Sequence, residues 1–473
     1  MQQPANLMEA LAARVKQAPD KLAFAYLDDQ CDVVNQLSNQ QLYTRATAVA
    51  GRLQQIIDPS DRVLLLFPQG LEFIYAFLGV MYSGAVPVVT APPRATQHDD
   101  ARICHVENII EETGSNVVLT STSILNEVVQ CFFKSSKLSQ KILLAVEDVN
   151  DDLINHWSMP VVDSNSTAYL QRTSASAREG SPKFVMISHD NINSVHESIK
   201  NDYKLTASSR SVHWLPNYHY LGLALGILQP LYCGYRGYIC SQFDFYKNPG
   251  NWLNAITRYE ITFSGAPDFA YRMCVDQVSD PKENSLNLSG WKTAYSSGES
   301  VNKETMDSFF KKFSYCGLKE MALTSFYGLA ESAYVASESN YPKNPTIIPR
   351  KSMQRLSGGM AENNQDSHAE AKITSCGLPV SDTRVVVIIP GTLTRCSELE
   401  LGEILVSSKC NALGYWNQPA ETERIFNVYP EGSEDGPYLR TGDLGFIKGG
   451  EVHVVGSLTD YRKETRSPVS ISG

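Results

Sequence analysis

The chain has 473 residues, of which 42% are hydrophobic and 19% are charged. This balance is that of a globular protein large enough for two or more subdomains, and it excludes a disordered or fibrous chain. The net charge of −10 argues against non-specific binding to nucleic acid, which needs a basic surface, but it permits a small anionic substrate held by N–H groups and one or two cations.

The cysteines and the N-terminus predict a cytoplasmic protein. None of the ten cysteines forms a Cys-x-x-Cys pair, so buried reduced thiols are expected in place of a zinc or redox site. The N-terminus lacks the basic and apolar regions of a signal peptide. The longest apolar stretch, 71–89, is interrupted by Glu72 and Pro87, so no membrane span is expected.

The first third of the chain shows alternating helix and strand patterns. Residues 7–17 carry Leu7, Leu11 and Val15 at helical spacing and predict an amphipathic helix. A second helix is predicted over 71–81. Continuous apolar runs predict buried strands at 62–67, 85–89, 117–120 and 142–146. This order of strand, helix and strand predicts a right-handed βαβ unit and a parallel sheet.

Changes in composition after residue 165 indicate further segments of the chain. Residues 165–335 alternate similarly, with Gly-, Ser- and Pro-rich turns at strand ends, where ligand sites of parallel sheets lie. Prolines and a polar run over 341–375 predict an inserted loop, and short strand-like runs such as 383–389 and 452–455 predict a β-rich subdomain. Two α/β subdomains are predicted at 1–165 and 166–340. The inserted loop follows at 341–375, the β-rich subdomain at 376–456 and a tail at 457–473.

A loop over 173–183 combines hydroxyl groups, a glycine and a lysine between two apolar segments. Its backbone N–H groups are suited to cradle phosphates, with Lys183 as a point charge. A serine-rich surface loop explains the same composition equally well. The candidate phosphate-binding residues are Thr173, Ser174, Ser176, Gly180 and Lys183.

Four longer motifs carry a resemblance to a known family. They are WLPNYHYLGL at 214–223 with GILQPLY at 226–232, YSSGES at 295–300, YGLAE at 327–331 and YLRTGDLG at 438–445. In this order they resemble the fatty acyl-AMP ligases, which are adenylate-forming enzymes. The 173–183 loop resembles the T-S-G-S-T-G-x-P-K-G loop of that family. The resemblance spans about residue 8 to 456.

The resemblance implies an α/β fold, that of the N-terminal domain of an adenylate-forming enzyme, with two α/β subdomains of mostly parallel sheets and a small β-rich subdomain. It places His219 near the substrate carboxylate, Tyr327 on adenine and Asp443 on the ribose hydroxyls. Lys183, His219 and Glu331 are the catalytic candidates, and Glu331 and Thr173 are the Mg²⁺ candidates. The implied cofactor-binding residues are Thr173, Ser174, Ser176, Gly180, Gly298, Glu299, Tyr327, Gly328, Leu329, Ala330 and Asp443. For His219 and Tyr327, a buried structural side chain is the alternative.

Several positions depart from the family pattern. Ala175 and Ala177 replace a glycine and a threonine of the loop, which is also longer, and Phe184 replaces the glycine after the lysine. Because glycines permit close approach of the backbone to phosphate, we expect the alanine Cβ and the phenylalanine ring to oppose it. Tyr220 stands at the family's aspartate, and Ser297 at a glycine.

Beyond Gly456 the pattern ends. The family has a Gly-Arg-x-Lys-Asp hinge and a mobile domain with a catalytic lysine, whereas 456–460 reads GSLTD. The mobile C-terminal domain is therefore expected to be absent.

The implied function is activation of a fatty acid with ATP and Mg²⁺ to an acyl-adenylate. The insertion at 341–375 favours an acyl carrier protein, or a polyketide or nonribosomal peptide synthase, as acceptor in place of coenzyme A. Two alternatives stay open: a catalytically decayed module that binds nucleotide or acyl-adenylate without turnover, and an inert product.

Overall fold

Apolar runs of the first third form a mainly parallel sheet. The computed structural model describes residues 6–93, 99–173, 182–279, 285–338, 345–349, 370–432 and 435–459. The parallel strands, in spatial order, are β7 (Thr167–Arg172), β4 (Val86–Val89), β3 (Arg62–Leu66), β5 (Val117–Thr120) and β6 (Ile142–Ala145). All residues of β4 and β5 are buried, which accounts for the apolar character of these strands up to Thr120 at the end of β5. The expected parallel sheet is confirmed.

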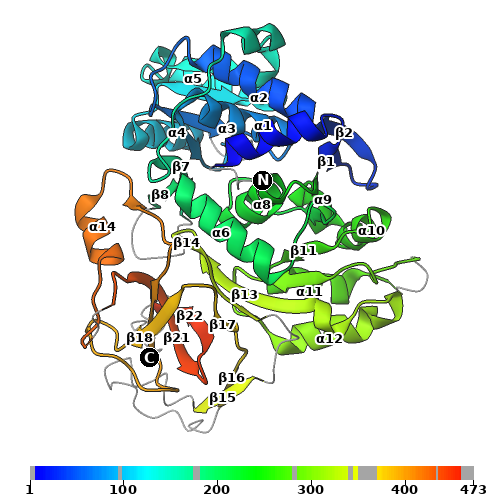
Figure 1. Cartoon of the computed structure of the whole chain (residues 1–473), viewed down its shortest axis with the longest axis vertical. Helices are drawn as coiled ribbons and strands as arrows, with labels where there is room; N and C mark the ends of the chain where they lie inside the picture. Colours follow the sequence, from blue (N-terminus) through cyan, green and yellow to red (C-terminus); the bar gives the residue numbers. More distant parts are fainter. Residues whose placement is uncertain are drawn as a thin grey trace, which may run out of the picture. The chain divides into compact units, whose positions relative to one another are not determined.

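The described residues divide into two compact units. Figure 1 labels their helices and strands. The first comprises Met1–Arg172, Lys183–Phe263 and Tyr415–Gln418. The second comprises Thr173–Pro182, Ser264–Gly414 and Pro419–Gly473. The division falls within β11 (Phe263–Ala266) and β20 (Gly414–Tyr415).

Helices of the first unit follow the sequence pattern closely. The predicted helix over 7–17 is α1 (Leu7–Gln17), capped by the side chain of Asn6, which accepts from the backbone N of Glu9. The predicted helix after β3 is α3 (Leu71–Ser83), in which every residue but Glu72 is buried. Further helices of this unit are α2 (Asn39–Leu53), α4 (Asp99–Thr113), α5 (Leu125–Lys134), α6 (His189–Asp202), α9 (Gln242–Lys247) and α10 (Gly250–Arg258).

A second group of strands in the first unit has the order β9 (Arg210–His213), β10 (Arg236–Cys240), β1 (Leu22–Leu27) and β2 (Val33–Ser38). β9, β10 and β1 run parallel, and β2 is antiparallel to β1. Between β9 and β10 the chain forms α7 (Tyr220–Leu223), a π-helical segment (Ala224–Leu228) and α8 (Gln229–Cys233). π-Helical segments occur frequently at functional sites, so this connection is a place to look for one.

The second unit begins with strands that continue the α/β pattern. β12 (Thr293–Ser296) pairs in parallel with β13 (Leu323–Leu329), which pairs antiparallel with β14 (Ser332–Glu338). β14 in turn pairs with β17 (Leu378–Pro379). Two longer helices belong to this part, α11 (Asp268–Gln277) and α12 (Lys303–Phe313).

Four antiparallel strands lie within the segment predicted to be β-rich. Their order is β18 (Arg384–Ile388), β19 (Gly402–Ser407), β21 (Leu439–Lys448) and β22 (Glu451–Ser457), with α14 (Pro419–Phe426) between the second and third. The strands expected at 383–389 and 452–455 are confirmed as β18 and β22. Most of the 341–375 insertion lies outside the described residues, but β15 (Thr346–Pro349) and β16 (Glu370–Ile373) pair antiparallel. Of the tail at 457–473, only the first residues are described.

In the part of the chain that the structure describes, no helix has both the length and the apolar character needed to cross a bilayer.

Candidate functional site

Tyr327 and Asp443 are in direct contact although 116 residues separate them in sequence. The Tyr327 hydroxyl donates to Asp443 Oδ2 at 2.6 Å, and the tyrosine is only 8% exposed. Burial, followed by the nearby charge of Asp443, raises the pKa of Tyr327 well above its usual value, so the phenol stays a neutral donor. The residues that the resemblance assigns to adenine and to the ribose hydroxyls are thus in direct contact.

Two irregular strand segments produce this contact. The β13–β14 ladder shifts register between Tyr327 and Leu329, where a Cβ on Gly328 would lie 2.3 Å from the carbonyl oxygen of Ala333. On β21, Gly442 has a φ of 73°. The Thr441 hydroxyl beside it donates to the Ile404 oxygen and accepts from the Asp443 N at 3.0 Å. The glycines of both motifs therefore shape backbone that a side chain would disturb.

Glu331 occupies the turn between β13 and β14. It is 2% exposed, and its carbonyl oxygen accepts from the N of Ala412 at 2.9 Å. No group of three or more His, Cys, Asp or Glu side chains suited to a metal occurs among the described residues. Mg²⁺ commonly uses one or two carboxylates together with substrate phosphates, so a single carboxylate at Glu331 fits that ion.

Gly298 and Glu299 follow the end of β12. Gly298 has a φ of 92°, which favours glycine. Glu299 Oε1 accepts from the backbone N of Phe269 at 2.7 Å and so caps the first turn of α11. Before them, the hydroxyls of Ser296 and Ser297, which belong to the same YSSGES motif, are buried without a hydrogen-bond partner among the described residues.

The ends of the 173–183 loop are held by strand pairing. Arg172 on β7 lies opposite Phe184 on β8 (Phe184–Ser188). Thr173 is partly buried, and Lys183 Nζ lies 4.9 Å from the centroid of the Tyr415 ring. Ser174, Ser176 and Gly180 lie outside the described residues, as do Ala175 and Ala177.

The Phe184 ring does not point at the loop. It is fully buried and belongs to a hydrophobic cluster with Leu66, Val88 and Leu170 of the parallel sheet. The expectation that this ring opposes close approach to phosphate was therefore wrong, because the ring contributes to the core.

His219 caps the short helix α7. Its Nδ1 accepts from the backbone N of Leu221 at 3.3 Å, and its own N donates to the Pro216 oxygen at 3.0 Å. Burial lowers the pKa of His219 to about 4, so the ring is neutral near pH 7. With Nδ1 as acceptor, the proton resides on Nε2, which is then a donor suited to a carboxylate. The Tyr220 ring, in place of the family's aspartate, lies 4.9 Å from the His219 ring.

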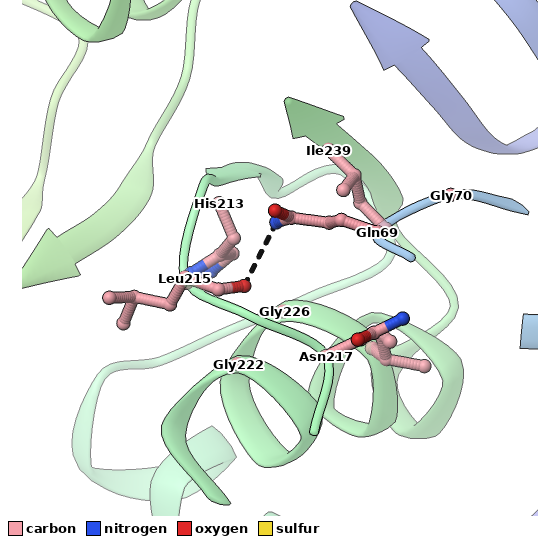
Figure 2. A pocket seen from close by; sticks show the side chains of 9 residues that line it. Gln69, Gly70, His213, Leu215, Asn217, Gly222, Gly226 and Ile239 are labelled. Carbon is pink, nitrogen blue, oxygen red and sulfur yellow. Dashed lines mark hydrogen bonds between the residues drawn. The ribbon is translucent and has the colours of Figure 1, made fainter. Parts of the chain in front are cut away.

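A small cavity lies in the first unit beside this histidine's turn (Figure 2). The polar side chains at its wall are Gln69, His213 and Asn217, and Gly222 and Gly226 of the following helix complete one side. Of these residues, Asn217, Gly222 and Gly226 fall within the motifs at 214–223 and 226–232, whereas no sequence pattern had marked Gln69 or His213. Asn217 is distinguished by the structure, because its Oδ1 is buried and has no hydrogen-bond partner among the described residues.

The site residues are spread over both units. Lys183 and His219 belong to the first, and Gly298, Glu299, Tyr327, Glu331 and Asp443 belong to the second. Within the second unit, the structure joins Tyr327 directly to Asp443.

Comparison with known proteins shows the family of the chain. The family model described as AMP-binding enzyme matches residues 11–416. The chain belongs to the AMP-binding enzyme family. A curated relative, the medium-chain-fatty-acid–[acyl-carrier-protein] ligase JamA of Moorena producens, is 34% identical over 96% of this chain and 77% of its own length.

Solved structures place this AMP-binding protein among the fatty acyl-AMP ligases and confirm that resemblance. The fatty acid AMP ligase of Legionella pneumophila has a TM-score of 0.85 and 32% identity, covering 98% of this chain and 79% of that one. The L. pneumophila fatty acyl-adenylate ligase in complex with acyl adenylate and pyrophosphate has a TM-score of 0.84 and 32% identity, covering 98% and 80%. The predicted fold class is thereby confirmed.

Proposed function

We propose that the protein activates a fatty acid with ATP, forming acyl-adenylate and pyrophosphate. The fatty carboxylate attacks the α-phosphorus of ATP, a new P–O bond forms, and the bond to the pyrophosphate oxygen breaks. The observation that carries the proposal is the contact between Tyr327 and Asp443. It puts an aromatic ring suited to a purine beside a carboxylate suited to the ribose hydroxyls.

The attack brings together two anions, and the chain's own residues offset their repulsion. The His219 Nε2 proton orients the fatty carboxylate, and the Lys183 ammonium offsets phosphate charge. Mg²⁺, when held by Glu331 and the phosphates, supplies further charge neutralisation. Thr173, Ser174, Ser176 and Gly180 are proposed to contact the phosphates, and Gly298, Gly328, Leu329 and Ala330 to shape the nucleotide pocket.

The acyl acceptor is proposed to be an acyl carrier protein. The support is the similarity to a relative named as a fatty-acid–acyl-carrier-protein ligase. A discharge assay with purified carrier protein and with coenzyme A distinguishes the two acceptors. Acylation of coenzyme A alone would contradict this part of the proposal.

The central test is fatty-acid-dependent exchange of labelled pyrophosphate into ATP. We expect exchange in the wild type with Mg²⁺, and a decrease of about 100-fold in Lys183→Ala and in Glu331→Ala, because each change removes charge stabilisation of the transferring phosphoryl group. AMP binding measured in parallel shows whether the variants are folded. Nucleotide binding without any exchange would instead support a binding module without turnover.

A further inference from the structure

The cavity beside Asn217 lies where ligand sites of α/β sheets are found. Gln69 and Gly70 follow the carboxyl end of β3, and Asn217 follows that of β9. Ile239 lies near the carboxyl end of β10, which runs parallel to β9. Segments that follow the carboxyl ends of parallel strands form the usual ligand-binding crevice. The opposite wall is the π-helical segment with Gly226, a second feature typical of functional sites.

Asn217 presents a hydrogen-bond acceptor to this cavity. The side chain is 4% exposed, and its Nδ2 donates to the Pro68 oxygen at 3.0 Å, so Oδ1 points away from Pro68 and has no partner among the residues that the structure describes. Gln69 on the facing wall already has partners for both of its polar atoms. Its Nε2 donates to the Leu215 oxygen, as Figure 2 shows, and its Oε1 accepts from the backbone N of Gln242. An unsatisfied buried acceptor costs free energy, which a matching donor recovers.

The size and charge of the cavity restrict that donor. The accessible volume of the cavity is about 10 Å³, which is enough for one small polar group but not for an alkyl chain. None of the nine lining residues is acidic, and burial lowers the pKa of His213 to about 3. Without a carboxylate to balance it, an ammonium group is disfavoured. A neutral hydroxyl fits both limits.

We propose that Asn217 selects an acyl substrate that carries a hydroxyl group near its carboxyl end. This inference rests on the proposed function, because it is His219 that would hold the carboxylate. Asn217 and His219 share one turn, closed by the bond from the His219 N to the Pro216 oxygen at 3.0 Å. In this proposal, a hydroxyl on one of the first carbons of the acyl chain enters the cavity and donates to Asn217 Oδ1, and Asn217 is then a specificity-determining residue.

The test compares binding of non-hydrolysable adenylate analogues by calorimetry. The probes are decanoyl sulfamoyl adenosine and the same conjugate with a single hydroxyl at carbon two, three, four or five. We expect at least one hydroxylated conjugate to bind the wild type about tenfold more tightly than the unsubstituted one, and Asn217→Leu to abolish this ratio. Asn217→Asp retains an acceptor and is expected to retain the preference.

Asn39→Leu is the matched control. Asn39 is equally buried at 4% exposure and also donates from Nδ2 to a carbonyl, that of Ala18 at 2.8 Å, but it does not line the cavity. This variant is expected to keep the wild-type ratio. Equal binding of all conjugates by the wild type, or a preference that survives in Asn217→Leu, would overturn the inference. Failure of every conjugate to bind would instead count against the proposed function.

Discussion

Asp443 is the residue whose charge the proposed nucleotide pocket depends on most directly. In Asp443→Asn, we expect the affinity for AMP to fall about 10- to 100-fold, since hydrogen bonds to a charged acceptor contribute about 1.5–3 kcal/mol. Isothermal titration with AMP measures this change. Tyr327→Phe, which keeps the ring and loses only the bond to Asp443, is expected to weaken binding less. Unchanged affinity in Asp443→Asn would refute the assignment.

Glu299 shows how a family motif position can acquire a structural task. Its carboxylate caps α11 through the N of Phe269, so Glu299→Ala is expected to lower the free energy of unfolding by about 1 kcal/mol. Glu299→Gln keeps the acceptor and is expected to keep most of that stability, with AMP affinity changed less than about twofold. Urea unfolding and AMP titration of both variants provide the measurements. A large loss of AMP affinity in the glutamine variant would show a direct role of the carboxylate.

Single residues also mark the limit of inference from sequence. The YGLAE and RTGD segments pointed to Tyr327 and Asp443 through their resemblance to a family in which these positions hold adenine and ribose. The Glu299 cap was not visible, since its partner Phe269 lies 30 residues earlier and on another element. The unpaired Oδ1 of Asn217 depends on which way an amide is turned, and no sequence pattern specifies that.

At the scale of elements, the turn between β13 and β14 depends on Gly328. A Cβ there would lie 2.3 Å from the Ala333 oxygen. Gly328→Ala is therefore expected to destabilise the protein by roughly 1–3 kcal/mol and to displace Glu331, which lowers pyrophosphate exchange. Gly290→Ala is the control, because nothing lies within 4 Å of its added Cβ. Thermal melting and exchange assays compare the two, and equal behaviour would contradict the argument.

Elements with a strong apolar pattern were predicted almost to the residue. The helix at 7–17 and the strand at 117–120 have the observed bounds, because the helix has apolar residues at helical spacing and the strand is a short, fully buried run. The interpretation of Phe184 was wrong because it relied on the position of the residue in the motif and not on its place along the strand. Its place in the motif suggested contact with the loop, whereas alternation along β8 turns its ring into the core.

For the whole molecule, buried histidines predict a dependence of stability on pH. Burial lowers the pKa of His189, His196 and His219 to about 4 and that of His213 to about 3. The unfolded chain titrates near pH 6.5, so between these values it binds more protons than the folded protein. The stabilising contribution is therefore complete above about pH 6.5 and is lost as the pH falls toward 4.

Urea unfolding at about pH 7.5 and about pH 5 measures this effect. We expect a lower unfolding midpoint at the acidic pH and a smaller difference in His196→Asn, which removes one buried imidazole that is bonded to Gln229 Oε1 at 2.6 Å. Identical midpoints at both pH values would contradict the prediction.

The pairing of Arg172 with Phe184 fixes both ends of the 173–183 segment on the sheet. Since β7 and β8 pair directly before and after this segment, we expect insertions and substitutions within it to leave the register of both strands unchanged. A segment grafted from a relative would then start and finish at unchanged positions.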